Sequence, residues 1–311
     1  MPIRNEAPHL ERAVASILSQ DYPLAFDVCL AVAVSDDDTA SVAAAIAARQ
    51  PRVTVVENPA GATPAGLNAA IAATSGTVIV RVDGHAELSN GYIRRAVETM
   101  RRTGAVNVGG IQAARGETRF EQGAAAAATS WLGTGGARYR VGGTQGPVDT
   151  VYLGVFDRAA GDAVGWFDEV LLRNQDYEFN IRLRRAGGVV WFDPALAVSY
   201  RPRGSAQALA SQYYQYGSWK ADVARRHPSS LRARQLAPPI AIVSVIAGLV
   251  LGVRWRRTLL APLTYAATVV STSLAGRAAA RHTATALVVM HTSWSVGFLR
   301  QLLRPSRLDA K

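Results

Sequence analysis

Cysteine is almost absent from this chain of 311 residues. The one cysteine, Cys29, lies inside an apolar run, so an intrachain disulfide and a Cys/His framework for a structural metal are both excluded. Its simplest role is that of a small buried hydrophobic side chain. A cleavable signal peptide is also lacking, because residues 1–21 are polar and helix-like. We therefore expect the first domain to stay in the cytoplasm.

Acidic residues are outnumbered, and the formal net charge is +11. Such a charge can favour binding to three kinds of partner: nucleic acid, anionic lipid or an anionic substrate. The chain has no RNP-like, helix-turn-helix or zinc-finger pattern, which argues against nucleic acid. Much of the arginine lies between Arg182 and Arg234 or beside apolar stretches, which favours contact with acidic lipid headgroups.

The first hundred residues alternate between strand and helix patterns. Such alternation predicts an α/β domain with a mostly parallel sheet and helices on both faces, with ligands beyond the carboxyl ends of the strands. Later strands are expected at 149–157 and 189–192, around a helix at 174–185. The expected early strands are 26–34, 53–57 and 77–82, and the expected helices are 8–20, 40–49, 63–73 and 90–101.

Two regions depart from this regular pattern. Residues 1–6 begin where a buried first strand would be ending, so we expect several more apolar residues upstream in the natural protein or its relatives; a tolerated short strand is the alternative. Residues 103–147 are rich in glycine, which predicts loops running over the sheet edge.

The chain closes with apolar segments at about 236–253, 259–276 and 284–299. A helix that crosses a bilayer needs about 20 apolar residues, so these segments predict about three membrane helices. A re-entrant or interfacial hairpin is the alternative for the first two, because the arginines at 254, 256 and 257 would face outward if the first segment crosses. An amphipathic, aromatic-rich helix is expected before them at 207–226.

Asp83 directly follows a predicted strand and precedes Gly84 and His85. A carboxylate at a strand end can reach a divalent cation, and a sugar diphosphate needs one to stabilise the charge on its leaving pyrophosphate. His85 is positioned to act as a second ligand or to donate to a phosphate. An ordinary Asp-Gly turn with an exposed histidine is the alternative.

Other carboxylates fall at positions suited to the same chemistry. Asp176 begins a predicted helix and can serve as the general base that takes the acceptor hydroxyl proton, or simply as a helix cap. The run Asp36–Asp38 can contact a nucleotide base or ribose, or form a solvated loop. Asn5 and Glu6, at the end of the first strand, can do similar work.

The tyrosines at 213, 214 and 216 can stack on a sugar or lie at a membrane interface.

Several strings together resemble the family 2 glycosyltransferases, in the succinoglycan-biosynthesis branch of bacterial exopolysaccharide enzymes. They keep their order and spacing over nearly the whole chain. They are PIRNE (2–6), SQDYP (19–23), TPAGLN (63–68), VRVDGHAE (80–87), NVGG (107–110), DTVYLGVFDR (149–158), NQDYEFNIRLRRAGG (174–188), SYRPRGS (199–205) and QYYQYGSWK (212–220).

The resemblance implies a GT-A fold, Rossmann-like, with inversion at the anomeric carbon and a nucleotide-sugar donor, UDP-sugar being favoured. It implies Mg²⁺ or Mn²⁺ at Asp83 and His85, the DXD-type position, and Asp176 as the general base. It also implies a lipid-linked saccharide acceptor and a place at the cell membrane with the catalytic domain in the cytoplasm. The expected nucleotide-sugar-binding residues are Pro2, Asn5, Glu6, Asp37, Asn68 and Asp83.

Three departures from the family pattern bear on specificity. His85 stands where most members have the last Asp of the metal motif. Residues 31–34, Ala-Val-Ala-Val, lack the Asp that holds the base in many members. Gln215-Tyr216 replaces the Arg-Trp of the processive synthases, which favours addition of a single sugar over polymerisation.

We therefore expect three parts: a transferase domain over 1–205, a juxtamembrane helix over 206–235 and a membrane-associated region over 236–311. The principal alternative is a non-catalytic, membrane-bound scaffold that binds a nucleotide-sugar. A channel or transporter is disfavoured, because no charged residue lies in the middle of an apolar segment and His291 more simply faces a neighbouring helix.

Overall fold

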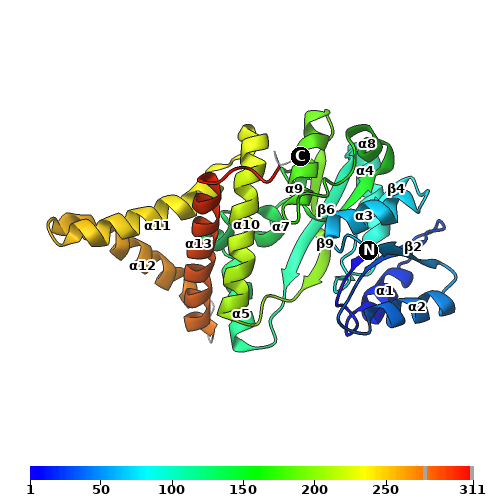
Figure 1. Ribbon diagram of the computed structural model, residues 1–311, viewed down its shortest axis with the longest axis horizontal. Coiled ribbons are helices and arrows are strands. Elements are labelled where there is room, and N and C mark those ends of the chain that lie inside the picture. The colour runs from blue at the N-terminus through cyan, green and yellow to red at the C-terminus, as the bar shows by residue number, and fades with distance from the viewer. Residues whose placement is uncertain (276–278, 309–311) are drawn as a thin grey trace. The chain divides into compact units, whose positions relative to one another are not determined.

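The computed structural model describes residues 1–275 and 279–308 and forms two compact units (Figure 1). The first unit contains Met1–Ala113 and Gly142–Tyr200, and the second contains Ala114–Val141 and Arg201–Lys311. Each unit therefore combines two separate stretches of the chain.

The first unit begins with a parallel three-stranded sheet, β1 (Pro2–Ile3), β2 (Val28–Ala33) and β3 (Val53–Asn58). Alternate residues of β2 point to opposite faces. Val28 and Leu30 join the main core with α1 (Leu10–Leu18) and α2 (Thr39–Arg49), whereas Cys29 and Ala31 pack with Ala70 of α3 (Thr63–Ala72). The expected helices on both faces are thus present, and Cys29 is buried as expected.

The second sheet of this unit has the order β4-β8-β6-β9-β5, with β7 paired to β9. The described pairs β4–β8, β6–β8, β5–β9 and β7–β9 are antiparallel. Its strands are β4 (Val78–Val80), β5 (Glu87–Leu88), β6 (Asn107–Ala114), β7 (Gly146–Pro147), β8 (Tyr152–Asp157) and β9 (Val190–Tyr200).

The expectation of one mostly parallel sheet was therefore wrong, since the strands form two sheets and these four pairs of the second are antiparallel. Helix and strand continue to alternate through α4 (Tyr92–Thr103), α8 (Arg158–Val164) and α9 (Gln175–Arg185), which is why the pattern predicted parallel crossovers. In the fold, β4 instead pairs with β8, more than seventy residues later.

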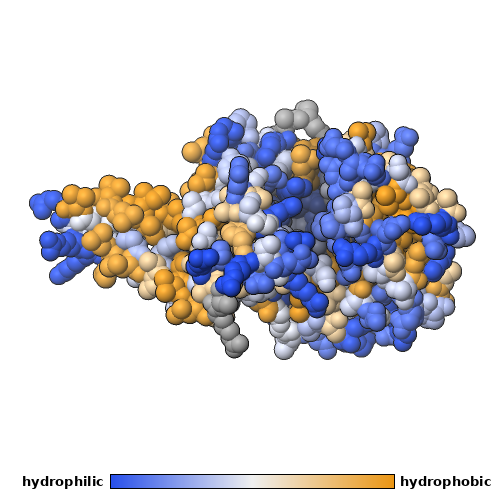
Figure 2. Space-filling view, turned by 90° about the horizontal axis from the view of Figure 1, so that it is seen from below, coloured by the Kyte–Doolittle hydropathy of each residue, from blue (hydrophilic) through white to orange (hydrophobic). Residues whose placement is uncertain are grey.

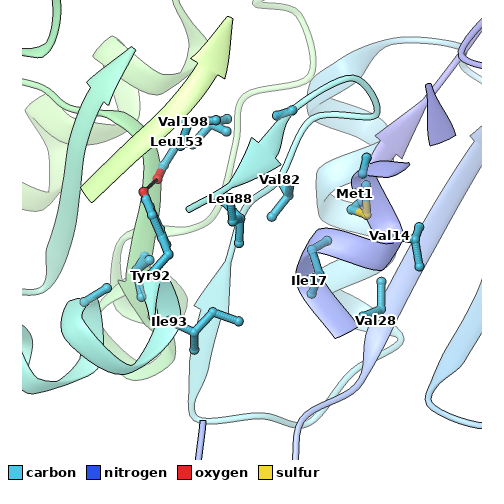
Figure 3. Close-up of a cluster of buried hydrophobic side chains, with 14 of the residues drawn as sticks. Met1, Val14, Ile17, Val28, Val82, Leu88, Tyr92, Ile93, Leu153 and Val198 are labelled. Carbon is cyan, nitrogen blue, oxygen red and sulfur yellow. Dashed lines mark hydrogen bonds between the residues drawn. The ribbon is translucent and has the colours of Figure 1, made fainter. Parts of the chain in front are cut away.

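The main core of the first unit joins both sheets (Figure 3). Tyr92 of α4 is fully buried, and its hydroxyl donates to the carbonyl oxygen of Leu153 at 3.1 Å. Leu153 has a positive φ of 44°, a left-handed conformation that is rare for a residue with a side chain. This hydrogen bond links α4 to Leu153, near the start of β8.

The glycine-rich stretch was wrongly predicted to be loops, because it contains β6, α5 (Arg119–Thr129), α6 (Trp131–Thr134) and α7 (Arg138–Val141). Glycine in β6 allows close packing between strands: a Cβ on Gly110 would lie 1.7 Å from the carbonyl oxygen of Leu196 in β9. A strand interior needs glycine where another backbone comes this near.

In the described part of the second unit the regular elements are helices, apart from Ala114, the last residue of β6. Its long helices are α10 (Ala206–Arg226), α11 (Ala233–Gly252), α12 (Leu260–Leu274) and α13 (Ala280–Leu302), with short 3₁₀ turns η1 (Pro228–Ser230) and η2 (Arg256–Leu259). Helix α13 packs closely on α10, where a Cβ on Gly217 would lie 2.0 Å from the carbonyl oxygen of Trp294. His291 of α13 contacts the hydroxyl of Tyr265 in α12, as expected for a histidine that faces a neighbouring helix.

Among the described residues, one helix, α11, is long and apolar enough to cross a membrane by length and composition. The expectation of about three such helices therefore holds for one. Helix α12 has 15 residues, and α13 buries Leu287, Met290 and Phe298 inside the second unit. One qualifying helix is weak evidence for membrane association.

Candidate active site

Asp83 lies in the turn that follows β4, and its carboxylate is paired with Arg81. The guanidinium of Arg81 donates to Oδ1 of Asp83 from Nε at 3.2 Å and from Nη2 at 2.9 Å. Burial opposes ionisation of Asp83, but the charges of Arg81 and His85 outweigh it and hold the pKa of this carboxyl below its usual value. Asp83 is thus an anion that faces a fixed cation.

The same arginine also pairs with Asp176. Its Nη1 donates to Oδ1 of Asp176, the second residue of α9. The Arg81 side chain is only 6% exposed, whereas that of Asp176 is 38% exposed. Arg81 therefore holds together the two carboxylates that the sequence assigned to metal binding and to proton transfer, although they are 93 positions apart in the chain.

His85 contacts the loop that follows β1. Its Nδ1 lies 2.8 Å from Oε1 of Glu6, and its side chain is 41% exposed. Gly84 permits this approach, because a Cβ there would lie 2.7 Å from Cγ of Glu6. The glycine of the Asp-Gly-His sequence is therefore needed for space beside Glu6.

The loops after β1 and β2 are joined by a network of hydrogen bonds around Asn5 and Asp37. Asn5 has a φ of 55°, and its side chain exchanges hydrogen bonds with Asp36. Asp37 accepts from the Thr39 hydroxyl at 2.5 Å and from the amide of Ala7 at 3.2 Å. The Thr39 hydroxyl is the main reason why the pKa of Asp37 is lowered.

Two predicted binding residues have different surroundings. Pro2 of β1 lies beside α3, where a Cβ on Gly66 would come within 3.2 Å of Cβ of Pro2. Asn68 of α3 donates from Nδ2 to the carbonyl oxygen of Phe167 at 2.8 Å and to Glu169 at 2.9 Å, and its Oδ1 accepts from the amide of Phe167. These contacts tie Asn68 to the loop before α9, and they do not bring it to the carboxylates at Arg81.

Contacts therefore connect two groups of predicted residues. The first is Asn5, Glu6 and Asp37, in the loops after β1 and β2. The second is Asp83, His85 and Asp176 with Arg81, and the contact between Glu6 and His85 joins the two groups. Arg81 and Thr39 were missed by sequence reasoning. A cation two residues before Asp83 in the string VRVDG was the available signal for Arg81. For Thr39, the position one residue after Asp38 gave no chemical signal.

The donors at Asp83 and His85 suit a divalent cation that also binds phosphate. Within 1–275 and 279–308, no cluster of three or more His, Cys, Asp or Glu side chains is placed to hold a metal ion. Mg²⁺-type sites often use one or two protein ligands and take the rest from substrate phosphates and water. A carboxylate and an imidazole fit such an incomplete site, with Arg81 contacting only Oδ1 of Asp83.

Comparison with known proteins decides the family. Residues 1–165 match the family model described as glycosyl transferase family 2. The chain belongs to glycosyltransferase family 2. This glycosyltransferase is 30% identical to the succinoglycan biosynthesis protein ExoA of Rhizobium meliloti (strain 1021), over 97% of the chain and 94% of that relative. Both the suspected family and the assignment as an enzyme are confirmed.

The fold of this glycosyltransferase also matches a solved structure, the mannosyltransferase PcManGT from Pyrobaculum calidifontis in complex with GDP-Man and Mn²⁺. The TM-score is 0.68 at 18% identity, over 96% of this chain and 85% of that one. At this identity the match shows the fold alone, which is α/β and GT-A-like, with mixed sheets.

Proposed function

We propose that this glycosyltransferase moves a sugar, with inversion, from a nucleotide-sugar to a hydroxyl of a lipid-linked saccharide in exopolysaccharide or cell-envelope glycan synthesis. The observation that carries the proposal is the arginine-bridged pair Asp83 and Asp176. Inverting transfer needs a carboxylate for the donor's cation and another for the acceptor's proton. Arg81 forms ion pairs with both Asp83 and Asp176, which supports these two roles for them.

Asp176 is the general base in this proposal. Its side chain is more than one-third exposed at the first turn of α9, so an acceptor hydroxyl can approach it. As the hydroxyl oxygen attacks the anomeric carbon, Asp176 takes the proton and the bond to the donor phosphate breaks. Attack from the face opposite the leaving group inverts that carbon.

The donor side rests on the residues around Asp83. Asp83 and His85 would hold Mg²⁺ or Mn²⁺, which stabilises negative charge on the leaving pyrophosphate. Asn5, Glu6 and Asp37 would bind the nucleotide from the loops after β1 and β2, with Pro2 and Asn68 supporting them from β1 and α3. A UDP-sugar is our preferred donor, and the GDP-Man and Mn²⁺ bound by PcManGT make GDP-sugars the next to test.

Residues 1–205 would form the transferase domain, 206–235 a juxtamembrane helix and 236–311 the membrane-associated region. We place the enzyme at the cell membrane, with catalysis on the cytoplasmic side. The apolar helix α11 supports attachment to a bilayer. Such a position gives access to an acceptor whose lipid stays in the membrane.

The test is a transfer assay in membranes with a panel of UDP-, GDP- and dTDP-sugars, with Mn²⁺, with Mg²⁺ and with EDTA. We expect metal-dependent release of a single nucleotide, lost in Asp83→Asn and retained in Asp27→Asn, an exposed carboxylate outside the site. Equal release in EDTA, or full activity of Asp83→Asn, would refute the assignment of Asp83.

A further inference from the structure

The positive charge of the protein comes from one region. Residues 223–308 contain 12 arginines and no Asp, Glu or Lys, whereas the other residues contain 22 basic and 23 acidic side chains. Without this region the chain would be close to neutral. The same region contains α11, α12 and α13, so apolar helices and a net excess of arginine occur together.

Helix α11 is apolar around its whole circumference. From Ile240 to Gly252 only Gly248 is buried, and Ser244 is the only residue with a polar side chain. Val250 is 68% exposed and Ile246 is 57% exposed. A helix that lies in the plane of a membrane surface needs a polar face, and α11 has none. A helix that is apolar on all sides belongs in a core or across a bilayer.

Helices α11 and α12 form a closely packed hairpin (Figure 1). A Cβ on Gly248 would lie 2.6 Å from the carbonyl oxygen of Thr258, and the Thr258 hydroxyl donates to the carbonyl oxygen of Gly248 at 3.1 Å. Gly252 lies similarly close to Leu259. These contacts hold the end of α11 against the start of α12, so we expect the two helices to insert into a membrane as one hairpin.

The tip of this hairpin is polar although its sides are apolar (Figure 2). Arg254, Arg256 and Arg257 surround Trp255 there, and the neighbouring Val253 is 94% exposed. Arginine in the middle of a bilayer costs roughly 2.5–3.5 kcal/mol per residue on insertion scales. Arginine with tryptophan is instead typical of the headgroup layer.

Length allows the tip to reach the far headgroup layer. The apolar stretches are residues 236–253 and 259–275, which as helices of about 1.5 Å per residue would span about 27 and 26 Å. The hydrocarbon core is about 30 Å thick, and spanning helices range down to about 17 residues. Arginine side chains at the tip can extend over the remaining few ångströms.

We propose that α11 and α12 insert together, tip first, as a hairpin that crosses an anionic bilayer. This inference rests on the proposed position of the enzyme at the membrane. The tip holds three arginines, and six lie within about 20 residues of the base, at 225, 226, 232, 234, 277 and 281, so the excess of positive charge keeps the base of the hairpin on the cytoplasmic side. Helix α13 stays with α10, because Gly297 brings it against the carbonyl oxygen of Tyr214.

Cysteine labelling in spheroplasts of a bacterial host tests the crossing. In a Cys29→Ala background, Val253→Cys marks the tip and Ser229→Cys marks an exposed position at the base. We expect a membrane-impermeant maleimide to label Val253→Cys equally before and after lysis, and Ser229→Cys about tenfold more after lysis, since a headgroup-exposed tip lies across the barrier. A tip that is labelled only after lysis, or not at all, would overturn the proposal.

A second pair of variants removes the apolar surface of the hairpin. Val243→Asp adds a charge to the middle of α11, and Leu24→Asp adds the same charge at an exposed apolar position of the first unit. We expect Val243→Asp to reduce outside labelling of the tip about tenfold or more, and Leu24→Asp to leave it unchanged. Unchanged labelling in Val243→Asp would contradict a bilayer environment.

These outcomes separate the hairpin from the catalytic proposal. Loss of a transferase function would show in the donor assay and would leave the labelling pattern as predicted. If the tip is not labelled before lysis in an enzyme that still transfers sugar, the crossing hairpin is contradicted and the catalytic proposal is not.

Discussion

At the scale of single residues, Arg81 is the group that organises the candidate site. The sequence showed Asp83 and Asp176 as separate motifs, because nothing in their spacing says that a cation bridges them. Two carboxylates near one another repel, and Arg81 offsets that repulsion while fixing the orientation of both. We regard it as a positioning residue.

Replacing Arg81 tests this role. We expect Arg81→Met to lower kcat by about 10²-fold, because a shift of about 1 Å in a catalytic group costs that much, while KM for the donor changes far less. Arg81→Lys should recover part of kcat, since it keeps the charge but loses the two-pronged geometry. Steady-state kinetics measure both, with the exposed Arg12→Gln as control. A wild-type kcat in Arg81→Met would contradict the role of Arg81 as a positioning residue.

A second residue, Asp193, predicts how stability depends on pH. Burial opposes its ionisation, but Arg95 at 2.8 Å and the Ala195 amide outweigh burial and lower its pKa. A lowered folded pKa gives stability that is present above the usual pKa of about 3.9 and is lost as pH falls below it.

The corresponding variant is Asp193→Asn. We expect it to lose about 1–3 kcal/mol of unfolding free energy at pH 7, because hydrogen bonds to a charged group are removed. The difference from wild type should shrink below about pH 4, where wild-type Asp193 also becomes neutral. Denaturant unfolding at several pH values measures this, with Asp27→Asn expected to match wild type. A difference that stays constant with pH would contradict the assignment.

At the scale of elements, the packing of α10 on α13 gives a further prediction. Gly217 faces the backbone of α13, so Gly217→Ala must push the helices apart. We expect a loss of about 1–3 kcal/mol, as for other overpacked interiors. Gly76→Ala is the matched control, because its Cβ would make an ordinary 3.5 Å contact. Thermal unfolding compares the two, and equal stability would show that the interface can relax.

Local pattern predicted most elements of the first hundred residues, and it failed where long-range packing decides. Helices α1 to α4 begin and end within two residues of their predicted bounds. Strand β6 was missed because its glycines allow contact with distant residues, Gly109 with Val151 and Gly110 with Leu196. The antiparallel pairing of β4 with β8 was missed for a similar reason, since alternation along the chain does not identify a strand's partner.

For the site, the motif positions placed Asp176 at a helix start, where the structure has it, and Asp83 directly after a strand. In the structure β4 ends at Val80, and Asp83 lies in the turn that follows. The contacts between these motifs could not be predicted from the sequence. The pairing of His85 with Glu6 and the anchoring of Asn68 to Phe167 both depend on how loops meet in space. The roles of these residues remain predictions.

At the scale of the whole molecule, chemistry and charge occupy different parts of the chain. The candidate catalytic carboxylates lie in the first unit, and the arginine-rich, acid-free region lies in the second. A glycosyltransferase divided in this way can bind a water-soluble donor with one unit and an anionic membrane with the other. Such a division suits an acceptor that carries a lipid.

The most direct test of the proposed transfer is the Asp176→Asn variant of the full chain in membranes. With the donor identified by the panel, we expect donor binding within about threefold of wild type, because the general base acts in the transition state. Sugar transfer should fall by about 10²–10⁴-fold. Transfer at the wild-type rate in Asp176→Asn would contradict the proposed mechanism.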